Sequence, residues 1–385
     1  MLAPLGLNFL YMTHLLSQFF RQNVRVVGSC LVVCALAVTG CIDGDGIKQE
    51  IGRPVAKGRT GEIIVVVDSA KWAGPVGEAM RLAIAPPVPG LLGEEPSFTM
   101  RHVNPYQFND LLRRHKNIIF LAPLEGTSAS TQRMKQFFTK ESLERIAKDD
   151  STYMLVKQNE FAMGQTVLFL FGKTDNILIH NIKQHQAKLG AIFNEVEIRR
   201  MTQTYLKMRA ENGSLDGNIL KTHRVSISLP VGYKFVMEKV FGNGEAGFVW
   251  VRAPDYEIDR NVFLAYKPYL SEKQFDQDSI LAWRNQLCQS YIFGDPGKKQ
   301  SYLITEQLVP PTFQVSKVGT RYAVEMRGLW RTNEQVVMGG TFLSYVFADP
   351  DKGRIYYAEG FLYAPAKNYK RELMREFEVV LKNIK

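Results

Sequence analysis

Apolar positions in the first part of the sequence form short continuous runs that alternate with longer segments of helical spacing. Residues 63–67 and 118–121 are unbroken apolar runs, typical of strands that are buried on both faces of a sheet. Trp72, Val76 and Met80 recur at intervals of four residues, which indicates an amphipathic helix. The same criteria predict further strands at 98–103, 153–156 and 166–171 and further helices at 108–112, 131–148 and 175–209, the last broken near Gly190. Alternating strands and helices predict an α/β domain over residues 61–210.

Beyond residue 218 the pattern changes to closely spaced strand-like runs. They lie at 223–229, 233–240, 247–253, 260–267, 301–307, 313–318, 321–331, 336–348 and 354–363. Asn243-Gly244 between two runs is a hairpin signal, and helices are expected at 277–292 and 366–383. We therefore predict an antiparallel α+β domain at residues 219–385, with helices packed on its sheet. Residues 211–218 combine glycines with polar residues, which predicts an exposed linker between the two domains.

The first 41 residues carry an export pattern. Arg21 and Arg25 precede the apolar run 26–38, which has signal-peptide length and is short of the roughly 20 apolar residues of a membrane-spanning helix. Val38-Thr39-Gly40-Cys41 follows, and it resembles the lipobox of bacterial lipoproteins. An ordinary secretory signal and an uncleaved anchor are the alternatives, and either Met1 or Met12 can be the start.

The lipobox resemblance implies a modified cysteine and a cleaved leader. Residues 1–40 are then the signal peptide, and Cys41 carries a diacylglycerol and an amide-linked fatty acid such as palmitate. Residues 41–60 contain several glycines among charged residues and are expected to be a flexible tether. Cys30 and Cys34 would leave with the leader and Cys41 would carry lipid, so Cys288 would be the one remaining thiol. No internal disulfide is therefore expected, and Cys288 is expected to be a buried, inert thiol.

Charge narrows the possible partners. The chain carries +10, and removing Arg21 and Arg25 with the leader gives about 10 − 2 = +8. This charge suits a surface near anionic lipid or phosphorylated glycan. Lysines and arginines never form a long block, so we do not expect nucleic acid as a partner.

Several sequence stretches resemble a family of Bacteroidota envelope lipoproteins whose function is unassigned. They are Gly61 to Val66 with Asp68, Ser69 and Trp72, His115 to Ile119, Arg327 to Trp330, Met338 to Gly340, and Gly360 to Pro365. The resemblance covers nearly the whole chain after Cys41. It implies a lipid-anchored location in the cell envelope, on the outer membrane, and it supplies no catalytic residues.

Asp68 ends a predicted buried strand and begins a helix. Ligands of open α/β sheets often bind at such strand ends, so Asp68 could hold a metal or act as a base. The alternative is a helix N-cap, in which the carboxylate accepts a free backbone N–H group. The stretch lacks the glycines and lysine of a phosphate-binding loop.

The histidines and the densest basic cluster favour surface roles. His180 and His185 lie five residues apart rather than four, and no zinc motif occurs, so neither a metal site nor a cofactor is expected. Arg113, Arg114 and Lys116 lie at the end of a short predicted helix, where cations suit the helix dipole. The alternative is a functional role, in which these three residues contact phosphate or a lipid headgroup.

Two glutamates in the last strands are the other acid candidates. If the strands form a meander, Glu325 and Glu359 lie two strand spacings apart, about 9–10 Å. Carboxylates at roughly that distance can perform inverting glycoside hydrolysis. Strand periodicity does not force the two onto one face, and charged sheet faces usually form cross-strand ion pairs.

The leading hypothesis is therefore a non-catalytic, lipid-anchored envelope protein that binds a partner protein or an envelope glycan. The alternative is a hydrolase of envelope polysaccharide that uses Asp68 or the pair Glu325 and Glu359.

Overall fold

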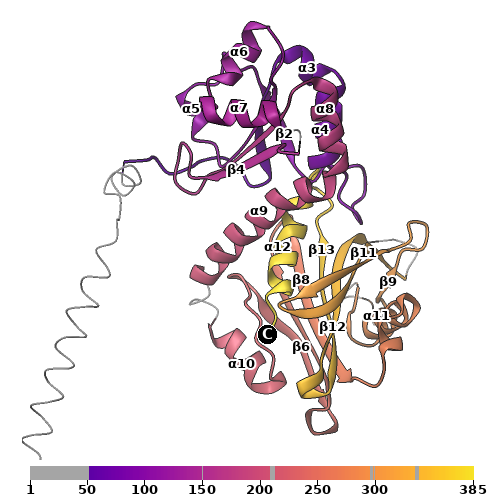
Figure 1. Ribbon diagram of the computed structural model, residues 1–385. Helices are drawn as coiled ribbons and strands as arrows, with labels where there is room; N and C mark the ends of the chain where they lie inside the picture. Colours follow the sequence, from indigo (N-terminus) through magenta and orange to yellow (C-terminus); the bar gives the residue numbers. More distant parts are fainter. Residues whose placement is uncertain (1–51, 150, 209–212, 295–297, 299, 334–337) are drawn as a thin grey trace, which may run out of the picture. The chain divides into compact units, whose positions relative to one another are not determined.

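A computed structural model describes residues 52–149, 151–208, 213–294, 298, 300–333 and 338–385 (Figure 1). The predicted signal peptide, Cys41 and the first part of the predicted tether lie outside the described residues. Residues 56–385 form one compact unit. Among the described residues, no helix is both long enough and apolar enough to span a membrane.

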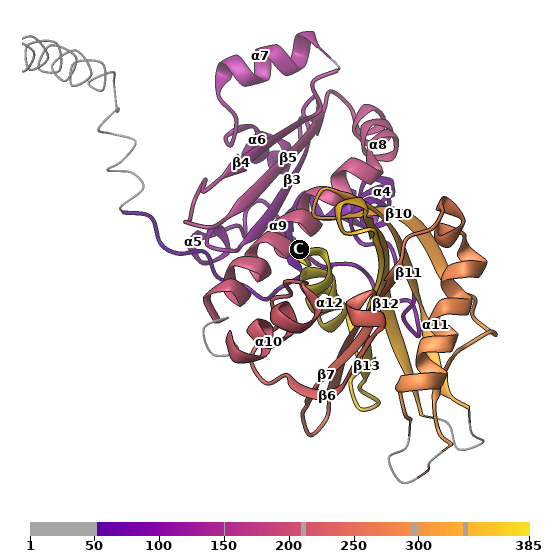
Figure 2. The same ribbon diagram turned by 90° about the horizontal axis from the view of Figure 1, so that it is seen from below.

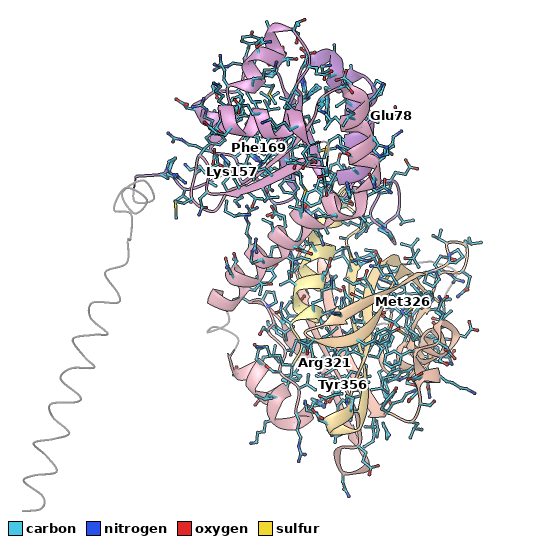
Figure 3. All side chains as sticks on the ribbon, in the orientation of Figure 1. Glu78, Lys157, Phe169, Arg321, Met326 and Tyr356 are labelled. Atoms are coloured by element: carbon cyan, nitrogen blue, oxygen red, sulfur yellow. The ribbon has the colours of Figure 1, made fainter. Side chains whose placement is uncertain are left out.

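The first region of this unit is built on a five-stranded sheet. Its strands are β1 Glu62–Val66, β2 Thr99–Val103, β3 Asn117–Pro123, β4 Met154–Gln158 and β5 Thr166–Gly172. They lie in the order β2-β1-β3-β5-β4, with all neighbours parallel except β4, which is antiparallel to β5. Lys157 of the edge strand β4 lies over the ring of Phe169 on β5, 5.5 Å from its centroid (Figure 3). The predicted α/β domain is confirmed.

Helices cover both faces of this sheet. On one face lie α3 Ser69–Ala73, α4 Pro75–Ile84, α8 Asp175–Gln184 and α9 Gln186–Met208, which pack on alternate residues of β1 such as Ile63 and Val65. On the other face lie α5 Asp110–Arg113, α6 Ala129–Lys135 and α7 Lys140–Lys148, against Ile64 and Val66.

Helix boundaries differ from the sequence prediction at three places. Gly74 and Pro75 divide the first predicted helix into α3 and α4, and Thr139 caps a separate α7 within the predicted helix 131–148. The break in the predicted helix 175–209 falls at His185 rather than at Gly190. Gly190 lies inside α9, where a Cβ atom would come within 3.1 Å of the Ala83 carbonyl oxygen of α4. That glycine therefore permits close helix packing and does not end a helix.

The second region is an eight-stranded antiparallel sheet with helices on both faces. Its strands are β6 Lys234–Phe241, β7 Ala246–Pro254, β8 Asp259–Pro268, β9 Leu303–Thr305, β10 Thr312–Val318, β11 Arg321–Thr332, β12 Gly339–Asp349 and β13 Arg354–Tyr363. Their order is β10-β11-β12-β13-β8-β7-β6, and β9 pairs with β11. The left-handed Asn243 (φ 52°) forms the predicted hairpin turn between β6 and β7. The predicted antiparallel α+β fold is confirmed.

Three helices complete the second region, and they are α10 Gly213–His223, α11 Gln277–Tyr291 and α12 Arg371–Lys382. Figure 2 shows α11 on one side of the strands and α10 and α12 on the other. The sheet has a hydrophobic core on each face. Ile280 of α11 shares one core with Tyr357, and Phe377 of α12 shares the other core with Tyr356, the preceding residue of β13.

Two sequence predictions at the start of this region are wrong. Residues 223–229 do not form a strand of the sheet, although Val225, Ile227 and Leu229 are buried. Ser226 instead forms two backbone hydrogen bonds with Lys385, at 2.8 and 2.9 Å, and Lys385 belongs to no strand. In the predicted linker 211–218, residues 211 and 212 lie outside the described residues, and residues 213–218 are helical. Buried Leu215 and Ile219, one turn apart, fold this stretch against the core.

Candidate functional site

The described structure contains a cavity of about 340 Å³ that is lined by residues of both the α/β region and the antiparallel region. We call it the junction cavity. This volume is within the range of small-ligand sites, roughly 300–1,000 Å³. One wall comes from the segment 84–98 and from α9, and the other comes from β10, β11 and α12. Its polar lining includes Asn194, Gln314, Ser316, Glu325, Arg327, Arg371, Arg375, Glu378 and Lys382.

Strand periodicity places Glu325 and Arg327 on the same face of β11, because they are two residues apart. Glu325 is buried, and its carboxylate accepts hydrogen bonds from the Gln314 amide at 2.6 Å, the Arg327 Nε at 2.5 Å and the Tyr345 hydroxyl at 2.7 Å. Gln314 and Tyr345 are the residues in register with Glu325 on the two neighbouring strands. Three donors therefore hold this carboxylate in place.

Helix α12 extends this pairing into a chain of charges. The Arg327 Nη2 lies 3.3 Å from the Glu378 carboxylate, and the Lys382 ammonium donates to the same carboxylate at 2.7 Å. Burial by itself lowers the pKa of Arg327, but Glu325 and Glu378 outweigh it and raise the pKa. For Glu378, burial raises the pKa, but the neighbouring Arg327 and Lys382 outweigh it, so its pKa is lowered. Arg327 and Glu378 are therefore held as ions.

A glutamate from the first region caps α12. The Glu95 carboxylate accepts the backbone N–H groups of Lys370 at 2.8 Å and of Arg371 at 3.0 Å, and α12 has no cap from its own N-cap side chain. Free N–H groups at a helix start favour a negative partner. Glu95 supplies this partner from a loop 275 residues earlier in the chain.

Two arginines of α12 bind the same loop in return. Arg371 donates to the Pro96 carbonyl at 2.6 Å and to the Thr99 hydroxyl at 3.1 Å. Arg375 donates to the Ser97 carbonyl at 3.1 Å, and its guanidinium lies 4.9 Å from the Phe98 ring centroid. The loop is consequently fixed to α12 through both main chain and side chains.

The charges around the junction cavity balance. Four cations line it, together with Glu325 and Glu378. Glu95 and Glu372 add two further carboxylates bonded to Arg371 and Arg375. Ile84, Pro86, Val88, Pro89, Phe98 and Met374 supply an apolar side. The cavity thus offers fixed donors and acceptors beside an apolar surface, without net charge.

Glu359 is the other glutamate of the predicted catalytic pair, and it does not face Glu325. Glu325 is in register with Tyr345 on β12, whereas Glu359 is in register with the preceding residue, Ser344. Successive residues of a strand point to opposite faces, so the two carboxylates lie on opposite sides of the sheet. The meander is confirmed, but the pairing of these acids in one hydrolytic site is wrong.

Glu359 instead forms a fully buried ion pair with Arg284 of α11. The Arg284 Nε and Nη2 donate to the two carboxylate oxygens at 2.9 and 2.8 Å, and Nη1 donates to the Thr305 hydroxyl at 2.9 Å. Burial alone lowers the pKa of Arg284, but the facing carboxylate outweighs it and raises the pKa. Burial raises the pKa of the Cys288 thiol to about 12, with Arg284 opposing. Cys288 is therefore buried, as predicted.

Asp68 has the predicted capping role. Its carboxylate accepts the backbone N–H of Ala70 at 2.9 Å at the N-cap of α3. The hydroxyl of Ser130, more than the surrounding backbone N–H groups, holds the pKa of Asp68 below its usual range. In the described part of the chain, no three His, Cys, Asp or Glu side chains gather closely enough to hold a metal ion.

Arg113, Arg114 and Lys116 lie together at the end of α5 and the start of β3. Arg113 pairs with Asp110 at 3.2 Å and lies over the Phe161 ring, whereas Arg114 is exposed to solvent. The helix-end position is confirmed, and contact with phosphate or lipid stays a prediction.

The α/β region followed by the antiparallel α+β region corresponds to two known domain families. Residues 56–206 match a domain of unknown function (DUF8532), and residues 212–383 match another domain of unknown function (DUF4837). These two matches fit an uncharacterised family. No curated protein matches the chain in sequence.

Sequence reasoning found Glu325 but missed its surroundings. In the strand predicted at 321–331, Arg327 follows Glu325 by two residues, so strand periodicity puts both on one face. Glu95 gave no signal, because a polar residue in a proline-rich loop carries no periodicity. Only the fold brings it to α12.

Proposed function

We propose that this protein is a lipid-anchored component of the bacterial cell envelope, held in the outer membrane through Cys41, and that its role is binding rather than catalysis. The proposal that the role is binding rests on the bonds that the candidate catalytic carboxylates already form. Asp68 caps a helix, Glu325 accepts three hydrogen bonds, and Glu359 forms a buried ion pair. A general acid or base needs a proton that it can exchange with substrate, and each of these carboxylates is already engaged in structural bonds.

The ligand that best suits the junction cavity is a short neutral saccharide of an envelope glycan. A saccharide presents many hydroxyl groups and also apolar C–H surfaces. The cavity offers amides of Asn194 and Gln314 and the ion chain around Arg327 for the hydroxyls, and an apolar side for the C–H groups. Its balanced charge gives no advantage to an anionic ligand.

Saccharide binding is tested by saturation-transfer NMR on the chain from residue 42 onwards. The probes are neutral di- and trisaccharides built from hexoses and N-acetylhexosamines. Gln314→Ala combined with Asn194→Ala should remove the signal, because both amides line the cavity. The matched control Gln203→Ala, an exposed amide of α9, should keep it. Absence of binding by the unchanged protein, or equal loss in the control, would contradict the proposal.

The anchor is tested separately in cells by labelling with a fatty-acid analogue. Cys41→Ser should abolish labelling and leave uncleaved precursor, because lipid is attached through that thiol. Cys34→Ser in the apolar run should label normally. Normal labelling of the Cys41→Ser protein would exclude the lipid anchor.

A further inference from the structure

The compact unit begins beside the basic cluster that follows α5. The Ala56 N–H donates to the Met163 carbonyl at 2.8 Å, and the Lys57 N–H donates to the Arg114 carbonyl at 2.7 Å. Lys116 in turn donates to the Lys57 carbonyl at 2.9 Å. In Figure 1 the first described residues of the unit, coloured indigo, run beside α5 accordingly. The start of the unit is therefore fixed to this cluster by main-chain bonds.

Cations dominate this part of the surface, which we call the basic face. It consists of Lys57, Arg59, Arg101, Arg113, Arg114 and Lys116. The carboxylates bonded among them are Glu62, which pairs with Arg101 at 2.5 Å, and Asp110, which pairs with Arg113. The sum is 6 − 2 = +4. Lys57, Arg59 and Arg114 are exposed to solvent, so their charges are available to a partner.

We infer that the basic face contacts the phosphate groups of anionic phospholipids in the membrane that holds the anchor. This inference rests on the proposed lipid at Cys41. Ala56 is the fifteenth residue after Cys41 (56 − 41 = 15). A chain of that length spans at most about 50 Å even when fully extended. The point where this chain joins the compact unit, at the basic face, is therefore at most that distance from the proposed anchor.

Charge and apolar exposure both fit a phospholipid surface. Clustered lysines and arginines next to a membrane attachment point are attracted by the negative potential of anionic lipids. Leu111 of α5 is 78% exposed and adjoins the cluster, and such a side chain can enter the headgroup region. The acyl chains already provide stable attachment, so the contact acts on the orientation of the compact unit relative to the membrane.

The test measures vesicle binding by the unlipidated chain from residue 42 onwards, so it does not depend on acylation at Cys41. This chain keeps all of the compact unit 56–385. Vesicles of phosphatidylcholine are compared with vesicles that also contain phosphatidylglycerol, at low and high ionic strength. The test variant combines Lys57→Glu, Arg59→Glu and Arg114→Glu. The control makes the same charge change on exposed residues of α7, with Lys140→Glu, Arg145→Glu and Lys148→Glu.

We expect binding only to the vesicles with phosphatidylglycerol, and we expect it to weaken at high salt. The basic-face variant should bind at least about tenfold more weakly, and the control variant should lose much less. Unchanged melting temperatures establish that all three proteins are folded.

The inference is overturned if the unchanged chain does not bind anionic vesicles, or if both variants lose binding equally. Displacement by millimolar inorganic phosphate would indicate a small-anion site instead of a lipid surface. Failure of this test together with normal labelling of Cys41 would leave the anchor in place and remove only the inferred contact.

Discussion

At the residue scale, the second region keeps two charges in its interior only because they face each other. Arg284 and Glu359 have no exposed side-chain surface. A buried ion that loses its partner destabilises a protein by about 3–5 kcal/mol. Replacing both partners by apolar residues of similar volume is often neutral, since no uncompensated charge remains.

Glu359→Gln should therefore lower the free energy of unfolding by about 3–5 kcal/mol. The double variant Arg284→Met with Glu359→Leu should recover most of that loss. Urea unfolding followed by circular dichroism measures both. For comparison, Glu257→Gln removes the exposed partner of Lys367 and should cost less than about 1 kcal/mol. Similar effects of the exposed and the buried substitutions would contradict this account of the pair.

His223 makes stability depend on pH. It is fully buried between the Tyr266 hydroxyl and the Glu238 carboxylate. Burial lowers the pKa of His223, and the nearby Arg354 adds to this, whereas Glu238 opposes it. Below a pH of about 6.5, the usual pKa of histidine, the unfolded chain binds a proton that the folded protein does not. The free energy of unfolding should then fall as the pH drops from 7 towards 5.

His223→Gln should flatten this pH dependence. The slope due to a single proton is at most about 1.4 kcal/mol per pH unit. The exposed His180→Gln is the matched control and should leave the slope unchanged. Urea midpoints measured at several pH values give the slope. An unchanged slope in the His223 variant would show that another group is responsible.

At the scale of elements, α12 depends on a cap that lies outside its own sequence. Glu95→Ala leaves the first N–H groups of α12 without their carboxylate, and we expect a loss of about 1–2 kcal/mol in the free energy of unfolding. Glu95→Gln keeps an acceptor oxygen and should have an intermediate effect. Glu94→Ala removes an exposed neighbour and should be within about 0.5 kcal/mol of the unchanged protein. Chemical unfolding ranks the three variants.

The elements themselves were largely predictable, because hydrophobic periodicity is a local property. Strand β1 and the charged face of β11 follow directly from the alternation of residue types. The buried Val225, Ile227 and Leu229 show the limit of this reasoning. Alternate burial predicts a strand, but sheet membership requires a neighbouring strand to accept its hydrogen bonds. The junction cavity could not be predicted, since its two walls are far apart in sequence.

At the scale of the whole molecule, the Glu95 cap and the arginines of α12 link the α/β region to the antiparallel region. Because these contacts are numerous and at least partly buried, we expect both regions to unfold in one cooperative transition.

Replacing Arg371 and Arg375 together by alanine should uncouple the two regions. Hydrogen exchange under mild denaturant should then report a lower opening free energy for β1 to β5 than for β11 to β13. Lys367→Ala, which removes an exposed cation before the same helix, is the control and should leave both regions exchanging together. Uniform exchange in the double arginine variant would show that other contacts couple the regions.

The Glu95 cap also determines when folding can finish. Glu95 and Arg371 are 276 residues apart, and the backbone pairing of Ser226 uses the final residue, Lys385. Contacts of such long sequence separation form late and slow the folding of a chain. The α/β region therefore cannot complete its loop around Glu95 until the ribosome has released the last helix. A chain exported in the unfolded state would reach its native form only after its C-terminus has crossed the membrane, and nascent chains that end before residue 371 should remain sensitive to protease.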